Sequence, residues 1–273
     1  MNRKKPFDLI MLVFTWLSIG ITVAVLLLVV GYVLINGVLY IRPSLFAFQH
    51  TSQNQSLFPA LIGTLMIVGL SLTLAVPLGV FSAVYLVEYA KRGNQFVKLV
   101  RITTETLAGI PSIVYGLFGF IFFGVFLGWG LSLISGAFTV SIMILPLIMR
   151  TTEESLKSVP DTYREGSFGL GAGRLRTVVR IVLPTATPGI LAGVILAIGR
   201  IIGETAAIIF TLGNVARMPN NLFDTGRTLS AHMYVLANEG THPGEAHATA
   251  AVLLIVVILV NALSSWVARF IKS

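Results

Sequence analysis

The sequence contains no cysteine and few charged residues. With 0 Cys among 273 residues, a disulfide framework, a cysteine-ligated metal site and thiol catalysis are excluded. Charged residues make up 11% of the chain, whereas a soluble domain has roughly 25%. No Gly-x-x-x-x-Gly-Lys-Ser/Thr segment occurs, so the chain lacks the loop with which P-loop ATPases hold phosphates. A hydrophobic content of 55% and a mean hydropathy of +0.89 instead indicate an integral membrane protein.

Long apolar runs predict six membrane-spanning helices in one all-α bundle over residues 1–273. Each run is long enough to cross a hydrocarbon layer of roughly 30 Å. The predicted spans cover about residues 9–36, 57–88, 107–127, 133–149, 185–212 and 248–270. The first apolar run, from Leu9 to Ile35, exceeds the roughly 7–15 residues of a signal peptide, and we therefore expect it to be a retained span.

The basic residues predict the orientation of the chain, which has a formal net charge of +8. Arg200 lies within a predicted span. Of the other Lys and Arg residues, only Arg42, Arg217 and Arg227 fall on one side of the predicted membrane. Short loops rich in Lys and Arg face the cytoplasm. We therefore expect a multi-pass protein of the cytoplasmic membrane with both termini in the cytoplasm, and a basic charge that orients it rather than binding nucleic acid.

A polar loop at about residues 150–184 contains a predicted short helix. Pro160 disfavours a helical conformation in the residue before it. Thr162 and Glu165 have the spacing of a capping box, in which each side chain bonds to a free amide of the first turn. Gly171 and neighbouring glycines end the helix soon after. A helix this short is not stable alone, so we expect it to dock on a partner. Its expected anchors are aromatic or apolar: Tyr163, Phe168 and Leu170.

The spacing in this loop resembles the EAA loop of permeases in ATP-driven, binding-protein-dependent importers. Glu165 is followed by two small residues, Gly166 and Ser167, then by Gly171, and by an Ile-x-Leu-Pro segment that ends at Pro184. The resemblance implies a cytoplasmic coupling helix that sits in a groove of an ATPase and moves when ATP binds. The family has Ala-Ala where this chain has Gly-Ser, and both replacements are small. The alternative is an ordinary capped loop helix.

The fifth predicted span contains two opposite charges, Arg200 and Glu204. Residues four apart lie on one helical face, and a charge at the centre of a span costs roughly 2.5 to 3.5 kcal/mol on insertion scales. We therefore expect both to face a water-filled path or a partner subunit. One interpretation is an internal ion pair that only neutralises itself. The other is an anion path in which Arg200 attracts the substrate and Glu204 positions the arginine.

Further segments resemble the permeases of the phosphate-specific transport system, in particular the PstA type. The resemblance covers about residues 57–270 and rests on four segments: Ala108–Gly119, Met149–Glu154, Lys157–Asp161 and Gly203–Ala207. The last of them favours the PstA type over the PstC type, whose string is usually Gly-Glu-Thr-Met. The resemblance implies the fold of a type I ABC importer permease. It also implies a place for Arg150 in the transport path, although an arginine at the end of a span can equally be an interfacial anchor.

The resemblance implies the partners as well. They are a second, PstC-like permease, a PstB-like ATPase dimer in the cytoplasm and a PstS-like phosphate-binding protein outside. No catalytic residue and no cofactor is expected in this chain, because the ATPase would bind ATP and Mg. Two alternatives remain open: a permease of the same superfamily for sulfate or molybdate, and a stand-alone secondary transporter, which would leave the EAA loop without a partner.

Three of the four histidines fall in a predicted outer loop over about residues 213–247. His242, Glu245 and His247 lack the i,i+4 histidine pair of the H-E-x-x-H zinc site, so we expect no metal site there. We expect His232 and Tyr234 of the same loop to contact the protein that delivers the substrate.

Overall fold

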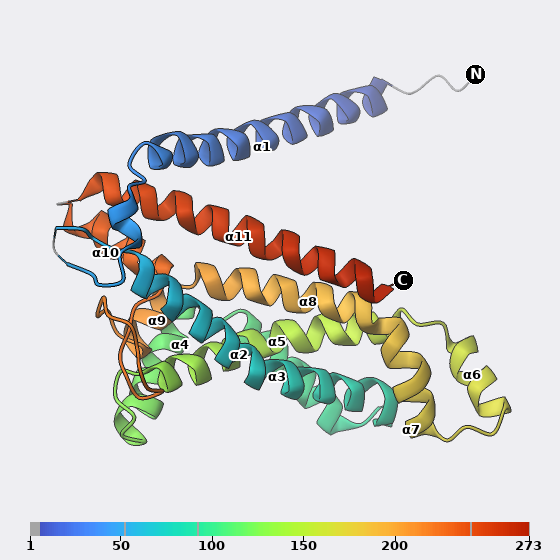
Figure 1. Cartoon of the computed structure of the whole chain (residues 1–273). Coiled ribbons are helices and arrows are strands. Elements are labelled where there is room, and N and C mark those ends of the chain that lie inside the picture. Colours follow the sequence, from blue (N-terminus) through green and yellow to red (C-terminus); the bar gives the residue numbers. More distant parts are fainter. Residues whose placement is uncertain (1–5, 52, 92, 241, 273) are drawn as a thin grey trace.

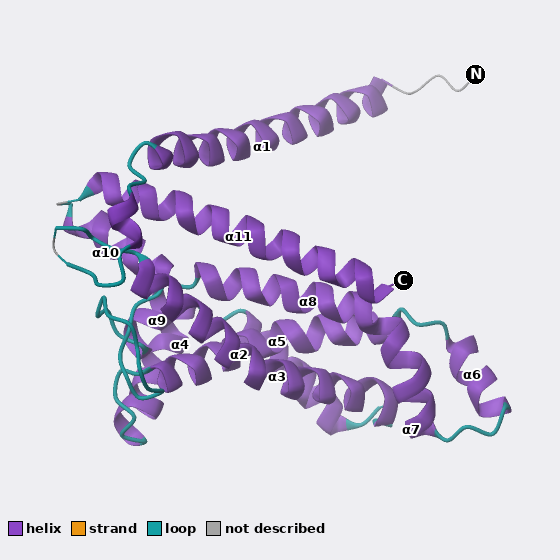
Figure 2. Ribbon diagram, in the orientation of Figure 1, coloured by secondary structure: helices purple, strands orange, loops and turns teal. Residues whose placement is uncertain are grey.

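The computed structural model describes residues 6–51, 53–91, 93–240 and 242–272, and this part of the chain contains helices and loops but no strand (Figures 1 and 2). The α-helices are α1 (Pro6–Val38), α2 (Phe58–Val84), α3 (Gln95–Ala108), α4 (Ser112–Gly119), α5 (Leu133–Lys157), α6 (Asp161–Gly169), α7 (Arg174–Thr177), α8 (Leu183–Gly203), α9 (Ala206–Thr211), α10 (Leu229–Glu239) and α11 (Pro243–Lys272). A 3-10 helix, η1 (Pro43–Phe46), and three π-helical segments, η2 (Tyr85–Tyr89), η3 (Phe120–Phe126) and η4 (Val178–Val182), complete them. The predicted all-α class is confirmed.

Helix α5 is the centre of the bundle. In its most apolar window 67% of the residues are buried, compared with 28% or less in the other helices long enough to span a membrane. Small residues allow α2 to approach it and form hydrogen bonds between the helices. The Ser71 hydroxyl donates to the Ala137 carbonyl at 3.2 Å, and the Ser141 hydroxyl donates to the Ser71 carbonyl at 3.1 Å. Such bonds between small polar residues stabilise helix contacts in membranes.

Helix α8 packs closely against α5 through two glycines. A Cβ atom at Gly193 would overlap Thr151, and one at Gly189 would overlap Ser155. The order of these contacts shows that the two helices are antiparallel. Gly189 and Gly193 form a G-x-x-x-G pair, and this pair therefore serves packing within the chain.

Among the described residues, five helices are long and apolar enough to span a membrane, and a bent pair, Gln95–Ala108 with Ser112–Phe126, brings the number to six. The number of predicted spans agrees with this arrangement, but the third span begins at Gln95 rather than near residue 107 and is bent. Its two halves meet at 103° because Pro111 has no amide hydrogen and disfavours a helical conformation at Ile110. Helix α3, before the bend, occupies most of the segment between the second and third predicted spans.

The fifth and sixth predicted spans also have different limits. The fifth is a helical run from Arg174 to Gly203 that stops at Glu204, so the predicted continuous span over 185–212 is wrong. The last helix, α11, begins at Pro243 rather than near residue 248. His247 therefore lies in a helix and not, as expected, in a loop.

Helix α1 diverges from the bundle and is exposed along most of its length (Figure 1). It approaches α11 near its end, where a Cβ atom at Gly37 would overlap Ala251. The start of α1 and the end of α11 point to the same end of the molecule as α6 and α7 (Figure 1).

Candidate functional site

Arg200 lies in the last turn of α8 with its side chain exposed. Since Gly193 faces Thr151 in the antiparallel pair, continuing this register places Arg200 beside Ile144, near the middle of α5. This level lies within the predicted fifth span, and the position of Arg200 at the depth of the membrane core stays a prediction. Among the described residues, no carboxylate lies within ion-pair distance of it.

The predicted pairing of Glu204 with Arg200 is wrong. Glu204 has an extended backbone with ψ 126°, because α8 ends at Gly203, and residues four apart share a face only within one continuous helix. Its buried carboxylate instead accepts a hydrogen bond from the Ala207 amide at 3.1 Å. The Ser230 hydroxyl of α10 donates to the Glu204 carbonyl. Glu204 therefore stabilises the start of α9 and the break before it.

A second break, between α3 and α4, lies close to the first. Helices α4 and α9 approach so closely that a Cβ atom at Gly116 would lie 2.8 Å from the Ala207 Cα atom. The buried Tyr115 hydroxyl bridges the bend by donating to the Leu107 carbonyl at 2.8 Å, and Tyr115 lies within electrostatic range of Arg200. Substrate sites of many transporters lie where membrane helices are interrupted near the midplane. Two such interruptions, one after α8 and one between α3 and α4, lie beside Arg200.

Arg150 lies in the second half of α5 and is separated from Arg200. Its Nε atom contacts the Glu154 Oε1 atom at 3.0 Å, with both side chains more than half exposed. Because Arg150 precedes Thr151, which faces Gly193, it lies about six residues of α8, or roughly 9 Å, from the level of Arg200. The structure does not bring the two arginines together, and a pathway role for Arg150 stays a prediction.

The predicted short helix of the polar loop is α6, but its cap differs from the prediction. The helix begins at Asp161 with Pro160 at its N-cap and no side-chain capping bond, so Thr162 and Glu165 form no capping box. The C-terminal end closes with a Schellman motif: the Gly171 amide donates to Phe168 at 2.9 Å and the Ala172 amide donates to Ser167 at 3.1 Å. Gly171 has a φ of +81°, a conformation that favours glycine.

The proposed coupling residues differ in their exposure to solvent. Glu165 and Gly166 are exposed on α6, together with the aromatic and apolar anchors Tyr163, Phe168 and Leu170. Ser167 is buried, and its hydroxyl lies 2.8 Å from the Thr177 hydroxyl, which joins α6 to α7. Pro184 is exposed in the first turn of α8, directly after the π-helical segment η4. It lies inside a helical run that begins at Arg174, not at the start of the span.

Arg164 is the residue of this loop that the sequence did not identify. Its Nη2 atom lies 2.7 Å from the Glu88 Oε1 atom at the end of α2, and its guanidinium also donates to the Val159 and Leu156 carbonyls at 2.8 and 2.9 Å. The hydrogen bond with Glu88 raises the pKa of Arg164 above its ordinary value. Arg164 therefore fixes α6 to the ends of α2 and α5. Nothing local signals this contact, because Arg164 and Glu88 are 76 residues apart.

The end of the molecule opposite α6 contains a buried histidine, His232, in α10 (Figure 1). It is 0% exposed, so the expectation that it contacts an external protein is wrong, whereas Tyr234 is 51% exposed. Arg227 lies 3.0 Å from His232 Nδ1, and the Gln55 carbonyl lies 3.3 Å from Nε2. Burial, and then the positive charge of Arg227, lower the pKa of His232 to about 4. The imidazole is therefore neutral near pH 7.

The residues for which we expected no metal site lie around the start of α11. His242 Nδ1 is 3.8 Å from Glu245 Oε2, and His247 Nδ1 is 2.6 Å from the Pro243 carbonyl. Within the described ranges no group of three or more His, Cys, Asp or Glu side chains is arranged to hold a metal ion.

Comparison with known proteins places the chain in a family. Residues 75–273 match the family described as the binding-protein-dependent transport system inner membrane component. The chain is 33% identical over 294 residues to the probable ABC transporter permease protein YqgI of Bacillus subtilis, covering 99% of this chain and 98% of that protein. It is 37% identical over 219 residues to the phosphate transport system permease protein PstA 1 of Mycobacterium tuberculosis, covering 79% of this chain and 71% of that protein.

The fold agrees with this match. A chain of the crystal structure of the bacterial alginate ABC transporter, in complex with its alginate pentasaccharide-bound periplasmic protein, superposes with a TM-score of 0.71 at 16% identity over 99% of both chains. The predicted fold of an ABC importer permease is confirmed. This chain belongs to the family of binding-protein-dependent transport system inner membrane components.

Proposed function

We propose that this chain is the PstA-type permease subunit of an ATP-driven importer of inorganic phosphate. Arg200 is the observation that carries the proposal. A cation within a span, with no carboxylate partner among the described residues and two helix breaks beside it, is costly unless it serves an anion. The similarity to phosphate transport permeases supports phosphate as that anion. In this proposal Glu204 maintains the break, and Arg200 alone attracts the substrate.

The partners follow from the same proposal. A PstC-like permease completes the path, and a PstS-like protein delivers phosphate at the outer end. A PstB-like ATPase dimer binds ATP and Mg and receives α6 through Glu165, Gly166 and the exposed anchors of that helix. Ser167 and Gly171 give α6 its shape. ATP-driven movement of α6 reaches α2 and α5 through Arg164, and it reaches α8 through α7 and the turn at Pro184.

The deciding experiment is uptake of radiolabelled phosphate by proteoliposomes that contain the assembled importer and its binding protein. We expect Arg200→Gln to abolish or greatly slow uptake and Arg200→Lys to retain more of it. Sulfate and molybdate are the controls for substrate. Equal transport of either one would reassign the substrate, and phosphate uptake without the ATPase would show a stand-alone transporter.

The membrane orientation is tested separately. We propose that both termini and α6 face the cytoplasm, because the basic loops and these elements lie at one end of the molecule (Figure 1). A reporter active only outside the cytoplasm should be silent when fused after Lys91 or Arg174 and active after Asn54 or Asn220. Activity after Arg174 would exclude contact between α6 and a cytoplasmic ATPase.

A further inference from the structure

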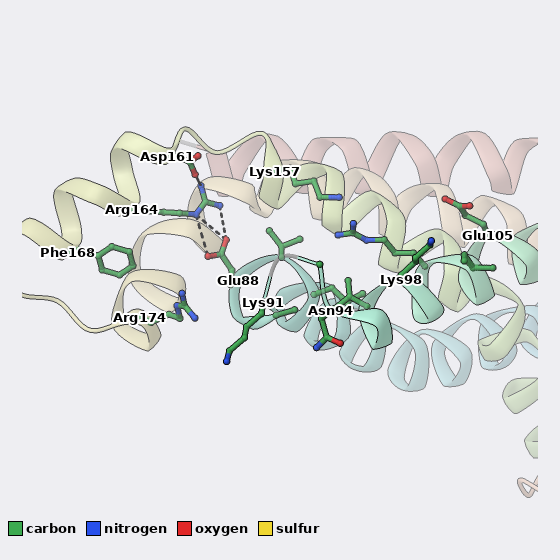
Figure 3. A pocket seen from close by; sticks show the side chains of 17 residues that line it. Glu88, Lys91, Asn94, Lys98, Glu105, Lys157, Asp161, Arg164, Phe168 and Arg174 are labelled. Carbon is green, nitrogen blue, oxygen red and sulfur yellow. Dashed lines mark hydrogen bonds and ion pairs between the residues drawn. The ribbon is translucent and has the colours of Figure 1, made fainter.

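A cavity of about 750 Å³ lies beside α6, outside the proposed transport path (Figure 3). It is bounded by η2 and the turn after it, by α3, by the last turn of α5, by α6 and by the start of α7. All of these except η2 itself contribute cationic side chains to the lining: Lys91, Lys98, Arg101, Lys157, Arg164 and Arg174. Three carboxylates also line it, so cations exceed anions.

Helix α3 supplies the charged side of the cavity because it is amphipathic. Lys98, Arg101 and Glu105 follow one another at intervals of three and four residues, which places them on one helical face. Phe96 and Leu99, which do not line this cavity, are exposed apolar residues elsewhere on α3. The charged face of α3 therefore lines the cavity, and the exposed apolar residues of the helix lie outside the cavity.

Two of the carboxylates in the cavity are already engaged by Arg164. Glu88 lies 2.7 Å and Asp161 lies 3.1 Å from its guanidinium group, as Figure 3 shows. These two carboxylates therefore leave little negative charge for the remaining cations.

The third carboxylate of the lining, Glu105, forms no ion pair among the described residues. A further carboxylate, Glu153, does not line the cavity but is shared by two cations that do. Glu153 Oε2 lies 3.2 Å from Arg101 and 2.8 Å from Lys157. Lys98 and Arg174 form no ion pair within the part of the chain that the structure describes. The contact of Arg174 is with a neutral group, since its guanidinium lies 5.8 Å from the centre of the Tyr89 ring. Cations thus converge on one cavity without enough anions to neutralise them.

We propose that this cavity binds a phosphoryl oxyanion, the group shared by inorganic phosphate and phospholipid headgroups. Lysine ammonium groups and the arginine fork are the donors that phosphoryl oxygens accept best. In the proposed orientation the cavity lies at the cytoplasmic ends of α2 and α5, within reach of lipid headgroups at the membrane surface and of free phosphate in the cytoplasm. Lys98 and Arg174 are the principal ligands, because neither forms an ion pair with a carboxylate of the described residues.

The test compares matched variants of the transporter purified through this chain, in nanodiscs and without binding protein or nucleotide. Lys98→Gln with Arg174→Gln removes the two ligands. Arg176→Gln is the control, because Arg176 is an exposed arginine of the same short helix that does not line the cavity. Lys98→Arg with Arg174→Lys retains both charges. Binding of radiolabelled inorganic phosphate is measured in neutral phosphatidylcholine discs, and retention of phosphatidylglycerol is measured by native mass spectrometry in mixed discs.

We expect the double glutamine variant to weaken one of these two interactions about tenfold, the typical loss for removing charge-assisted hydrogen bonds. The control and the charge-retaining variant should behave like the parent. Loss of phosphate binding in neutral discs identifies free phosphate as the ligand. Loss of phosphatidylglycerol retention with unchanged phosphate binding identifies the lipid headgroup. Parental values for both measurements in the double glutamine variant would overturn the proposal.

Discussion

The Arg164 guanidinium and the Glu88 carboxylate form an ion pair of 2.7 Å that joins α6 to the end of α2, and their side chains are 14% and 8% exposed. Arg164 also caps two carbonyl groups at the end of α5. A short helix that cannot hold its position alone is thereby fixed to two helices of the bundle. Any force that a partner applies to α6 therefore acts on α2 and α5.

The first prediction concerns this ion pair. Arg164→Met should leave Glu88 buried without its partner, and breaking a buried pair costs about 3 to 5 kcal/mol. We expect a lower midpoint of thermal unfolding and a loss of coupling between binding protein and ATPase activity. Glu88→Gln should have a smaller effect, since Arg164 keeps its bonds to the carbonyls. Arg176→Met is the control, and an equal effect of the two methionine variants would contradict the role of Arg164.

The second prediction concerns the end of α6. Gly171→Ala places a Cβ atom in open space, but a left-handed backbone costs a non-glycine residue about 1 to 2 kcal/mol. We expect the Schellman motif to weaken and ATP-coupled transport to fall, with normal membrane insertion. Gly169→Ala is the matched control. It also adds a methyl group in open space, but within the helix, where alanine is favoured by about 1 kcal/mol. Parental transport by Gly171→Ala would exclude a coupling role for this turn.

The third prediction is a pH dependence of stability at the outer end. The pKa of His232 is about 4 in the folded protein and 6.5 by its ordinary value, so the unfolded chain binds the extra proton between these pH values. Stability from this group should be complete above pH 6.5 and decline as the pH falls toward 4, by about 3 kcal/mol in total. Removing the titrating group in His232→Gln should flatten the pH dependence of the thermal midpoint in this window. His242→Gln, at a more exposed histidine, should leave it unchanged.

Local sequence rules predicted the short helix of the polar loop and its limits. Pro160 and Gly171 act through their own backbone, so the limits of α6 follow from residues within a few positions of each other. The capping box was wrong because the helix begins one residue before Thr162, which places that threonine inside the helix.

Contacts between distant segments could not be predicted in this way. Hydropathy is high on both sides of Glu204, so the sequence suggested one continuous span and a helical pair with Arg200. The break depends on tertiary partners, among them Ser230, which is 26 residues away. Glu88 is 76 residues from Arg164 and Gln55 is 177 residues from His232, so these contacts were equally hidden from a local reading of the sequence.

The last prediction separates the roles of Arg200 and Glu204. If Arg200 binds the anion in the path without help from Glu204, Arg200→Gln should lower phosphate uptake by about 10- to 100-fold. This is the range for losing a charged hydrogen-bond donor. Glu204→Gln should stay near the parental rate, because an amide oxygen can still accept the bond from the Ala207 amide. Glu204→Ala removes that acceptor and should lower both assembly and uptake.

The double variant Arg200→Gln with Glu204→Gln decides between the two interpretations of these charges. A pair that only neutralises itself would regain function when both charges are removed, whereas an unpaired arginine in the path would not. The helix break and the bond from Ala207 to Glu204 favour the second outcome, so uptake by the double variant should equal that of Arg200→Gln. The measurement is phosphate uptake in reconstituted vesicles, normalised to assembled complex. Recovery to the parental rate would show that the two side chains pair in another state of the transport cycle and that Arg200 is not needed for the anion.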